Sequence, residues 1–178
     1  MSSFYSNKEL YEFGFKSIGE NVNISRKTSI YSPDKISIGN NVRIDDFCIL
    51  SGNISLGSNI HISAYVGLYG SKGIKLEDYT GISPRCTLFS AMDDFGGDFL
   101  IGPIHPEKYT NVTGGEIIIK KFVQIGANSI LFPNIVIGEG TVIGAFSLVT
   151  KSLDEWGIYA GIPVVRRKDR SKKVKNIV

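Results

Sequence analysis

The chain has 178 residues, 42% of them hydrophobic and 21% charged, a composition typical of one globular domain with a sizeable core. It has no apolar run near the roughly 20 residues that cross a bilayer, and no signal-peptide pattern at its start. We therefore expect a cytoplasmic protein without membrane insertion. Its net charge of +3 is uneven, because basic residues crowd the C-terminal end.

Residues 1–16 form a predicted helical cap. Ser6 and Glu9 have the spacing of a capping box, in which each side chain binds the other residue's backbone N–H. Apolar residues follow from Leu10 to Phe15, and the predicted helix ends at Gly14. An apolar helix of this kind would cover the open end of the domain behind it.

An aliphatic residue recurs at six-residue steps from Ile18 onward. Two of the steps are eight residues long, after Ile30 and Leu68, and residues 89–118 interrupt the series. The aliphatic positions are Ile18, Ile24, Ile30, Ile38, Ile44, Leu50, Leu56, Ile62, Leu68, Leu76, Ile82, Leu88, Ile119, Ile125, Leu131, Ile137, Ile143 and Val149. Four residues after most of them stands a small or β-branched residue, which indicates a second inward-facing position.

A period of six favours a coil of three short walls, because a helix needs a period near 3.6. The aliphatic residues would then point into a triangular prism of about six coils over residues 17–165, followed by a basic tail over residues 166–178. Glycine and asparagine would supply the turn conformations at the corners. The asparagines in question are Asn21, Asn40, Asn41, Asn53 and Asn59.

The aliphatic-Gly-x-x-x-x pattern resembles the hexapeptide-repeat acyltransferases over roughly residues 17–165. The resemblance implies an all-β, left-handed parallel β-helix, usually a homotrimer with each site between neighbouring subunits. The run from Trp156 to Pro163 lacks the repeat. We expect it to cross back along the outside of the prism, with a short basic helix closing that end.

The long loop, residues 89–118, is the best candidate for a site, because loops of this length are uncommon unless they are functional. It carries His105, whose ordinary pKa suits a general base. In galactoside and chloramphenicol acetyltransferases of this fold, a loop histidine deprotonates the acceptor hydroxyl. One hypothesis is therefore a saccharide O-acetyltransferase with His105 as its base.

A second resemblance favours a different reaction. The run Ser90-Ala91-Met92-Asp93-Asp94, the pair Pro106-Glu107 and the ending Trp156–Pro163 are similar to N-acyltransferases that act on dTDP-linked 4-amino-4,6-dideoxyhexoses. The resemblance implies a sugar amine as nucleophile, and a role in surface polysaccharide synthesis. It also implies that Asp94 and Asp93 orient the amine or accept its proton, while Ser90 and Glu107 bind the sugar.

Two triplets, Ile125-Gly126-Ala127 and Ile143-Gly144-Ala145, lie eighteen residues apart and should stack on one corner. Such a bare corner could bind the pantetheine arm of acetyl-CoA or another acyl-CoA, with an amide of Gly126 or Ala127 facing the oxyanion. The basic residues Arg166, Arg167 and Lys168 could bind the phosphates of the cofactor. Tight corners and an ordinary solvated tail remain the structural alternatives.

Other classes of function fit less well. A γ-class carbonic anhydrase needs three histidine ligands, and the chain has only His61 and His105. We expect no metal and no nucleic-acid partner. A scaffold or sugar-binding module without activity stays open as an alternative.

Overall fold

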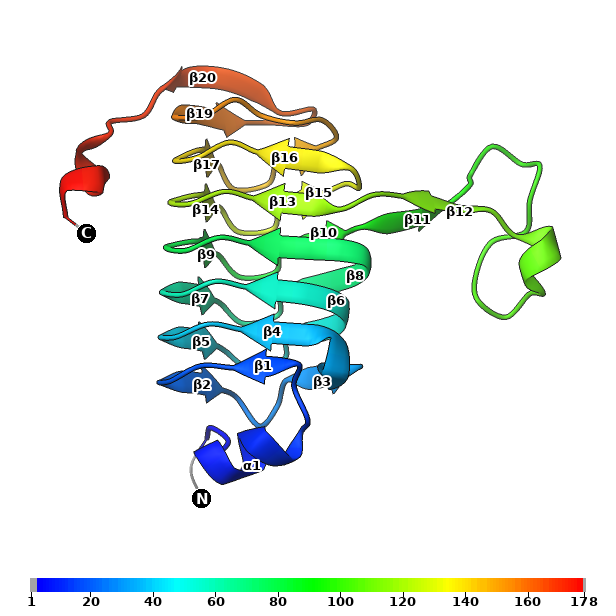
Figure 1. Ribbon diagram of the computed structural model, residues 1–178. Coiled ribbons are helices and arrows are strands. Elements are labelled where there is room, and N and C mark those ends of the chain that lie inside the picture. The colour runs from blue at the N-terminus through cyan, green and yellow to red at the C-terminus, as the bar shows by residue number, and fades with distance from the viewer. Residues whose placement is uncertain (1–2, 178) are drawn as a thin grey trace.

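The protein is a triangular prism of stacked coils, with a long arm on one side and a short helix at one end (Figure 1). The structure is a computed structural model that describes residues 3–177. Neighbouring coils pair through parallel strands in register, as Val22, Val42 and Ile60 do on one wall. The prediction of an all-β, left-handed parallel β-helix is confirmed.

Each wall of the prism is a ladder of short parallel strands, and two strands, β6 (Ile49–Leu56) and β8 (Gly67–Leu76), bend from the third wall into the first. The first wall also contains β1 (Ser17–Ile18), β4 (Ile36–Ile38), β13 (Ile117–Ile119) and β16 (Ile135–Ile137). The second wall contains β2 (Val22–Ile24), β5 (Val42–Ile44), β7 (Ile60–Ile62), β9 (Gly81–Ile82), β14 (Gln124–Ile125), β17 (Val142–Ile143) and β19 (Gly157–Ala160). The third wall adds β3 (Ser29–Tyr31), β10 (Thr87–Phe89), β15 (Ile130–Leu131) and β18 (Leu148–Val149).

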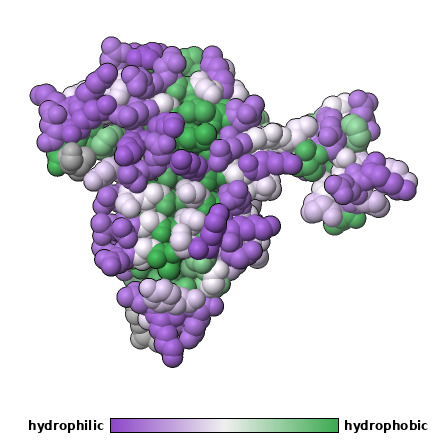
Figure 2. Space-filling view, in the orientation of Figure 1, coloured by the Kyte–Doolittle hydropathy of each residue, from purple (hydrophilic) through white to green (hydrophobic). Residues whose placement is uncertain are grey.

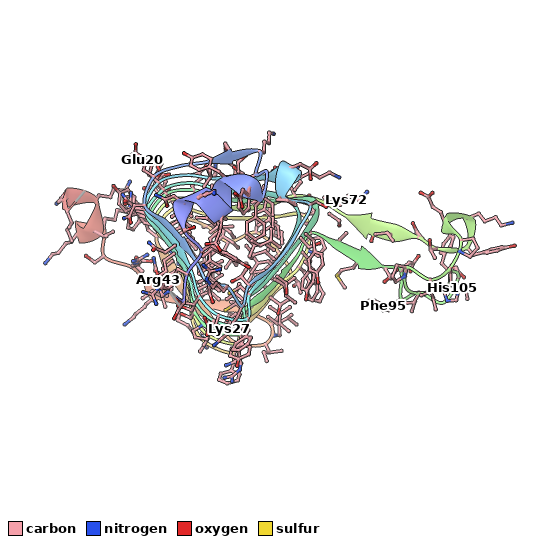
Figure 3. All side chains as sticks on the ribbon, turned by 90° about the horizontal axis from the view of Figure 1, so that it is seen from below. Glu20, Lys27, Arg43, Lys72, Phe95 and His105 are labelled. Atoms are coloured by element: carbon pink, nitrogen blue, oxygen red, sulfur yellow. The ribbon has the colours of Figure 1, made fainter. Side chains whose placement is uncertain are left out.

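Three corners join these walls. Corner one lies between the first and second walls, corner two between the second and third, and corner three between the third and first. Figure 3 looks along the prism and labels a residue at each: Glu20 at corner one, Lys27 at corner two and Lys72 at corner three.

The core follows the predicted repeat. All of the aliphatic positions are buried except Ile18 and Ile30, which are half-buried and pack against the core at the N-terminal end. The small residues four positions further on are buried as well, including the free cysteines Cys48 and Cys86. The six-residue period therefore fixes which side chains face inward.

Corners need a residue with a left-handed backbone three positions after the buried aliphatic residue. Asn21, Asn41 and Asn59 take this conformation as predicted. Asn40 and Asn53 do not, so that part of the prediction is wrong. At other corners the position holds an aromatic residue or arginine: Phe47, Tyr65, Tyr79, Arg85, Phe122, Phe146 and Trp156. None of these is β-branched, as the steric cost of a positive φ requires.

At the N-terminal end, helix α1 (Asn7–Glu12) begins with the predicted capping box, in which Ser6 and Glu9 bind each other's backbone N–H groups. Its Leu10 is buried against the first coil. The helix ends at Glu12, slightly before the predicted Gly14, whose φ of 72° lies outside the helix. No helix in the described chain is long and apolar enough to span a membrane.

The C-terminal end differs from the prediction. The run after Trp156 does not cross back outside the prism, because β19 pairs in parallel with β17 and forms a further coil. The prism therefore has about seven turns, where six were predicted. Strand β20 (Val165–Asp169) then returns antiparallel to β19.

The predicted closing helix is also misplaced. A short 3-10 helix, η3 (Lys173–Asn176), lies beside the prism and not over its end (Figure 1). It is held at corner one, where Lys175 forms an ion pair of 2.6 Å with Glu139. Lys175 and Lys172 also contact the Trp156 ring, at 4.9 and 5.7 Å from its centroid.

Candidate active site

The segment between β10 and β13 is an arm that projects from corner three (Figure 1). Its stem is an antiparallel ribbon of β11 (Ala91–Asp93) and β12 (Val112–Gly114). Beyond the stem lies a loop with a short 3-10 helix, η2 (Glu107–Tyr109). The predicted loop thus has a structure of its own, which holds the acidic run at its base.

The arm exposes several large apolar side chains: Phe95, Phe99, Leu100, Ile101, Ile104, Tyr109 and Val112. Ile104 is the most exposed of them, at 86%. An exposed apolar group of this size indicates a surface that another molecule covers.

Asp93 and Asp94 lie where the stem opens into the loop. The Asp94 carboxylate accepts hydrogen bonds from the Gly96 amide at 2.7 Å and from the Asn111 side chain at 3.1 Å. These two donors lower the pKa of Asp94, the Gly96 amide most, so the group is ionised at neutral pH. Asp93 is held less closely, with one oxygen 3.4 Å from the Gly102 amide.

The other predicted loop residues lie in different surroundings. Ser90 is buried, with an exposed fraction of 0%, and its hydroxyl donates to Tyr69 O and accepts from Lys72 N. Its side chain is committed to the wall of the prism, which argues against the predicted contact with sugar. His105 and Glu107 lie in the outer part of the arm (Figure 3).

A cavity of about 430 Å³, the arm-root groove, opens where the stem leaves the prism. It is lined by Asp93, by Ser51 and by the parallel rings of Tyr69 and Phe89, whose centroids are 5.3 Å apart. Such a groove offers a planar apolar face, a carboxylate and a hydroxyl to one ligand. Sequence reasoning missed the two aromatic residues. Their signal is an aromatic ring directly after Leu68 and Leu88, where glycine or serine is common.

The two Ile-Gly-Ala triplets stack on corner two, as predicted. Ile125 pairs with Ile143 in parallel register, and the Gly126 amide donates to Ile143 O at 2.7 Å. We call the residues Gly126, Ala127, Gly144 and Ala145 the alanine rail. Pro84 occupies the position of Ala127 one coil earlier, since Ile82 pairs with Ile125.

The glycines of the rail serve the stacking of coils. A Cβ on Gly126 would lie 2.5 Å from Ala145 N, and one on Gly144 would lie 2.9 Å from the Ala160 Cβ. Glycines at the same place on other coils are equally crowded, as at Gly19 and Gly138. The structural alternative therefore accounts for these glycines, and they are no signal for a ligand by themselves.

The alanines of the rail carry the chemistry that a ligand can use. The amides of Gly126 and Gly144 donate to carbonyls of the next coil, each at 2.7 Å, so Gly126 cannot supply the predicted oxyanion donor. The amides of Ala127 and Ala145 have no acceptor within residues 3–177. Pro84 has no N–H. Two unpaired donors, one coil apart, therefore begin at Ala127.

Basic residues lie near the C-terminal end of the rail, on β20, which pairs with β19 of the second wall. Arg166 bonds to the Tyr159 hydroxyl at 3.1 Å and to Asp169 at 2.7 Å. Asp169 and then Tyr159 raise the pKa of Arg166. Arg167 and Lys168 are exposed and form no ion pair with the described residues.

The rail and the arm do not meet within one chain. The sequence predicted a cofactor corner beside the acidic loop, but the rail lies on corner two and the arm leaves from corner three (Figure 3). The third wall separates them, because the rail precedes β15 while the arm follows β10. A site that uses both needs a second copy of the chain.

Within residues 3–177, no group of three or more His, Cys, Asp or Glu side chains is arranged to hold a metal ion. His61 lies on the second wall, where its Nε2 is 2.8 Å from Asp45, which also pairs with Arg43. His61 is therefore part of a surface ion network.

Comparison with known proteins gives three findings. A family model described as bacterial transferase hexapeptide (six repeats) matches residues 116–151. The dTDP-4-amino-4,6-dideoxy-D-glucose acyltransferase of Escherichia coli is 43% identical over 93% of this chain and 88% of its own length. AntD, an N-acyltransferase from Bacillus cereus solved in complex with dTDP-4-amino-4,6-dideoxyglucose and coenzyme A, is 54% identical, with a TM-score of 0.97 over 99% of this chain and 95% of its own.

A further complex of AntD contains dTDP and 3-hydroxybutyryl-CoA, with 55% identity and a TM-score of 0.97 over 99% of this chain and 95% of that one. The arm and both chain ends are included in this overlap. The match therefore extends well beyond the repeat itself.

Proposed function

The chain belongs to the hexapeptide-repeat acyltransferases that include the dTDP-4-amino-4,6-dideoxy-D-glucose acyltransferase of Escherichia coli, and on that basis we propose that it acylates the amino group of a dTDP-linked 4-amino-4,6-dideoxy sugar. The acyl donor is an acyl-CoA, with acetyl-CoA as the first candidate. The observation that carries the proposal is the likeness to AntD, which holds both kinds of substrate and matches 99% of this chain.

The arm-root groove is our proposed acceptor site. The stacked rings of Tyr69 and Phe89 offer an apolar face to the base or sugar, and Asp93 and Asp94 offer carboxylates to the amine and the sugar hydroxyls. Ser90 has no part in this, since its hydroxyl is buried and already bonded. Glu107 is kept as a predicted sugar contact.

The alanine rail is our proposed donor site. Pantetheine is a linear arm with amide groups, and the unpaired amides of Ala127 and Ala145 lie one coil apart along such a path. Arg167 and Lys168 near the C-terminal end of the rail suit the phosphates of the cofactor. Arg166 suits them less, because Asp169 already neutralises it.

The reaction itself needs alignment and charge stabilisation. The amine nitrogen forms a bond to the thioester carbon, the carbon–sulfur bond breaks, and its electron pair leaves on the sulfur of coenzyme A. The amine loses one proton and the thiolate gains one, so the step balances. The Ala127 N–H stabilises the oxyanion. Asp94 orients the amine, since its lowered pKa makes it a weak proton acceptor.

We extend the proposal to a homotrimer with each site between two copies. Two observations support it: the rail and the arm lie on different corners, and the arm carries exposed apolar side chains from Phe95 to Val112. Ile104→Ser should shift the molecular mass measured by light scattering toward the monomer and reduce turnover. A mass unchanged at every concentration, in both proteins, would contradict the trimer or the role of the arm.

The product is an N-acylated sugar nucleotide, which suits a glycosyltransferase that builds surface polysaccharide. Both substrates are water-soluble phosphorylated compounds, so a cytoplasmic reaction fits them. These two points rest on the proposed activity.

The activity is tested with dTDP-4-amino-4,6-dideoxyglucose and acetyl-CoA, by trapping the released thiol. The matched control is the same sugar nucleotide with a hydroxyl in place of the amine. We expect turnover with the amine only. Turnover with the hydroxyl acceptor, abolished in His105→Ala, would instead support O-acetylation with His105 as the base.

A further inference from the structure

The inside of corner two is lined by hydroxyl and thiol groups, where corner one is lined mainly by valine and isoleucine. Ser129, Ser147 and Cys86 occupy the buried position at corner two, with exposed fractions of 0%, 2% and 0%. At corner one the equivalent residues are Val22, Val42, Ile60, Thr80, Val123 and Thr141. Polar groups in the core need partners, and those at corner two find them on the rail.

Every one of these buried groups contacts a carbonyl of the rail. Ser129 Oγ lies 2.7 Å from Gly126 O and 3.1 Å from Gly144 O. Ser147 Oγ donates to Gly144 O at 2.7 Å, and Cys86 Sγ donates to Gly126 O at 3.1 Å. The single proton of Ser129 serves one carbonyl at a time or is shared between both. Both rail carbonyls are therefore drawn toward the core.

The orientation of a carbonyl fixes the orientation of the next amide. A trans peptide is planar, so its C=O and N–H point in opposite directions. When the carbonyls of Gly126 and Gly144 point into the prism, the N–H groups of Ala127 and Ala145 must point out of it. This explains why those two amides have no acceptor within the described chain.

We propose that Ser129, supported by Ser147 and Cys86, is a positioning residue that aims the Ala127 and Ala145 amides at an acyl-CoA. It does not touch the cofactor; it acts through the two peptide planes of the rail. This inference rests on the proposed function and deepens it, because it names what holds the donor groups in place. Preorganised donors of this kind lower the cost of binding and of developing charge.

The chain offers natural precedents for the variants that test this. Valine and cysteine occupy the equivalent corner-two position at Val66 and Cys86, so the fold accepts residues other than serine there. Thr141 at corner one has an equally buried hydroxyl, which donates to Asp154 O at 2.7 Å. Thr141→Val therefore removes a comparable hydrogen bond far from the rail.

The experiment compares Ser129→Ala, Ser129→Cys and Thr141→Val with the wild type. Calorimetry gives the Kd of coenzyme A, and steady-state kinetics give KM for acetyl-CoA, KM for the amino sugar nucleotide, and kcat. We expect Ser129→Ala to raise the Kd and the KM for acetyl-CoA about tenfold, the size of one or two lost hydrogen bonds. The KM for the sugar should not change, and Ser129→Cys should recover part of the loss.

A purely structural role predicts another result. Thr141→Val and Ser129→Ala would then lower the thermal midpoint alike and leave the Kd of coenzyme A alike, and the inference would be wrong. Should Ser129→Ala fail to fold, Ser147→Ala tests the Gly144–Ala145 peptide alone. In the wild type, coenzyme A should also slow hydrogen exchange at Ala127 and Ala145.

Failure of the inference and failure of the proposed function look different. A wild type that turns over normally, with unaltered binding in Ser129→Ala, refutes the positioning role only. A wild type that neither binds coenzyme A nor releases thiol refutes both.

Discussion

Corner one and corner two have the same backbone geometry but treat the same amide in opposite ways. At corner one, the second residue after the buried aliphatic position donates its N–H to a side chain of the next coil. Asn40 Oδ1 accepts from Glu20 N at 2.8 Å, and Ser58 Oγ accepts from Asn40 N at 3.0 Å. At corner two, Ala127 and Ala145 stand at this position, and a methyl group cannot accept a hydrogen bond.

The comparison teaches that one side chain per coil decides whether a corner is closed or open to a ligand. A polar residue closes it by bonding the amide of the coil below. Alanine leaves the amide unpaired, and proline, as at Pro84, removes the donor altogether. Corner two is thus open only from Ala127 onward, which is where we propose that acyl-CoA binds.

The largest effect is expected when the open corner loses its donor. Ala127→Pro reproduces Pro84, whose following residue Arg85 has φ 60°, close to the φ of 59° at Asn128. The backbone therefore accepts proline, and no internal hydrogen bond is lost. We expect kcat to fall about 100- to 1,000-fold, as for removal of an oxyanion donor. An unchanged thermal midpoint is the control, and near-normal kcat would remove Ala127 from the mechanism.

A somewhat smaller loss is expected at corner three, which separates the roles of the arm and the rail. Asp94→Asn keeps the shape and removes the charge, so kcat should fall about 100-fold while the Kd of coenzyme A stays the same. The lowered pKa of Asp94 means that it is protonated only in acid, so it should add no break near neutral pH to the rate profile. Wild-type turnover in this variant would count against a role for the carboxylate.

The comparison can also be broken by giving corner two the chemistry of corner one. In Ala145→Asn the new side-chain oxygen can accept from the Ala127 amide, as Asn40 accepts from Glu20. We expect the KM for acetyl-CoA to rise about tenfold, with a slight gain in thermal stability. Ala145→Leu, which adds bulk without an acceptor, separates capping from steric obstruction.

The reverse change at corner one should have the smallest effect. Asn40→Ala leaves the exposed Glu20 amide to bind water, so unfolding should cost about 0.5 kcal/mol less. The kinetic constants should stay at wild-type values. A change in the KM for acetyl-CoA would mean that corner one, and not only corner two, contacts the cofactor.

Much of the fold could be predicted from sequence because the repeat is a direct record of burial. Each aliphatic position, from Ile24 to Val149, faces the core at the place where the six-residue step puts it. The final coil escaped the pattern. Tyr159 takes the aliphatic position there, opposite Ile143, and it is 6% exposed. A larger ring fits this end, where no further coil stacks in register.

Sequence by itself determined the prism, its capped N-terminal end, the arm as an interruption and the alignment of the two triplets, because a strict period fixes inward direction and coil spacing. Only the tertiary structure decided that the rail and the arm lie on different corners, that Ser90 is bonded inside the wall and that Ala127 has a free amide. These depend on which neighbour each polar group meets in the adjacent coil, and that neighbour lies eighteen or more residues away in the sequence.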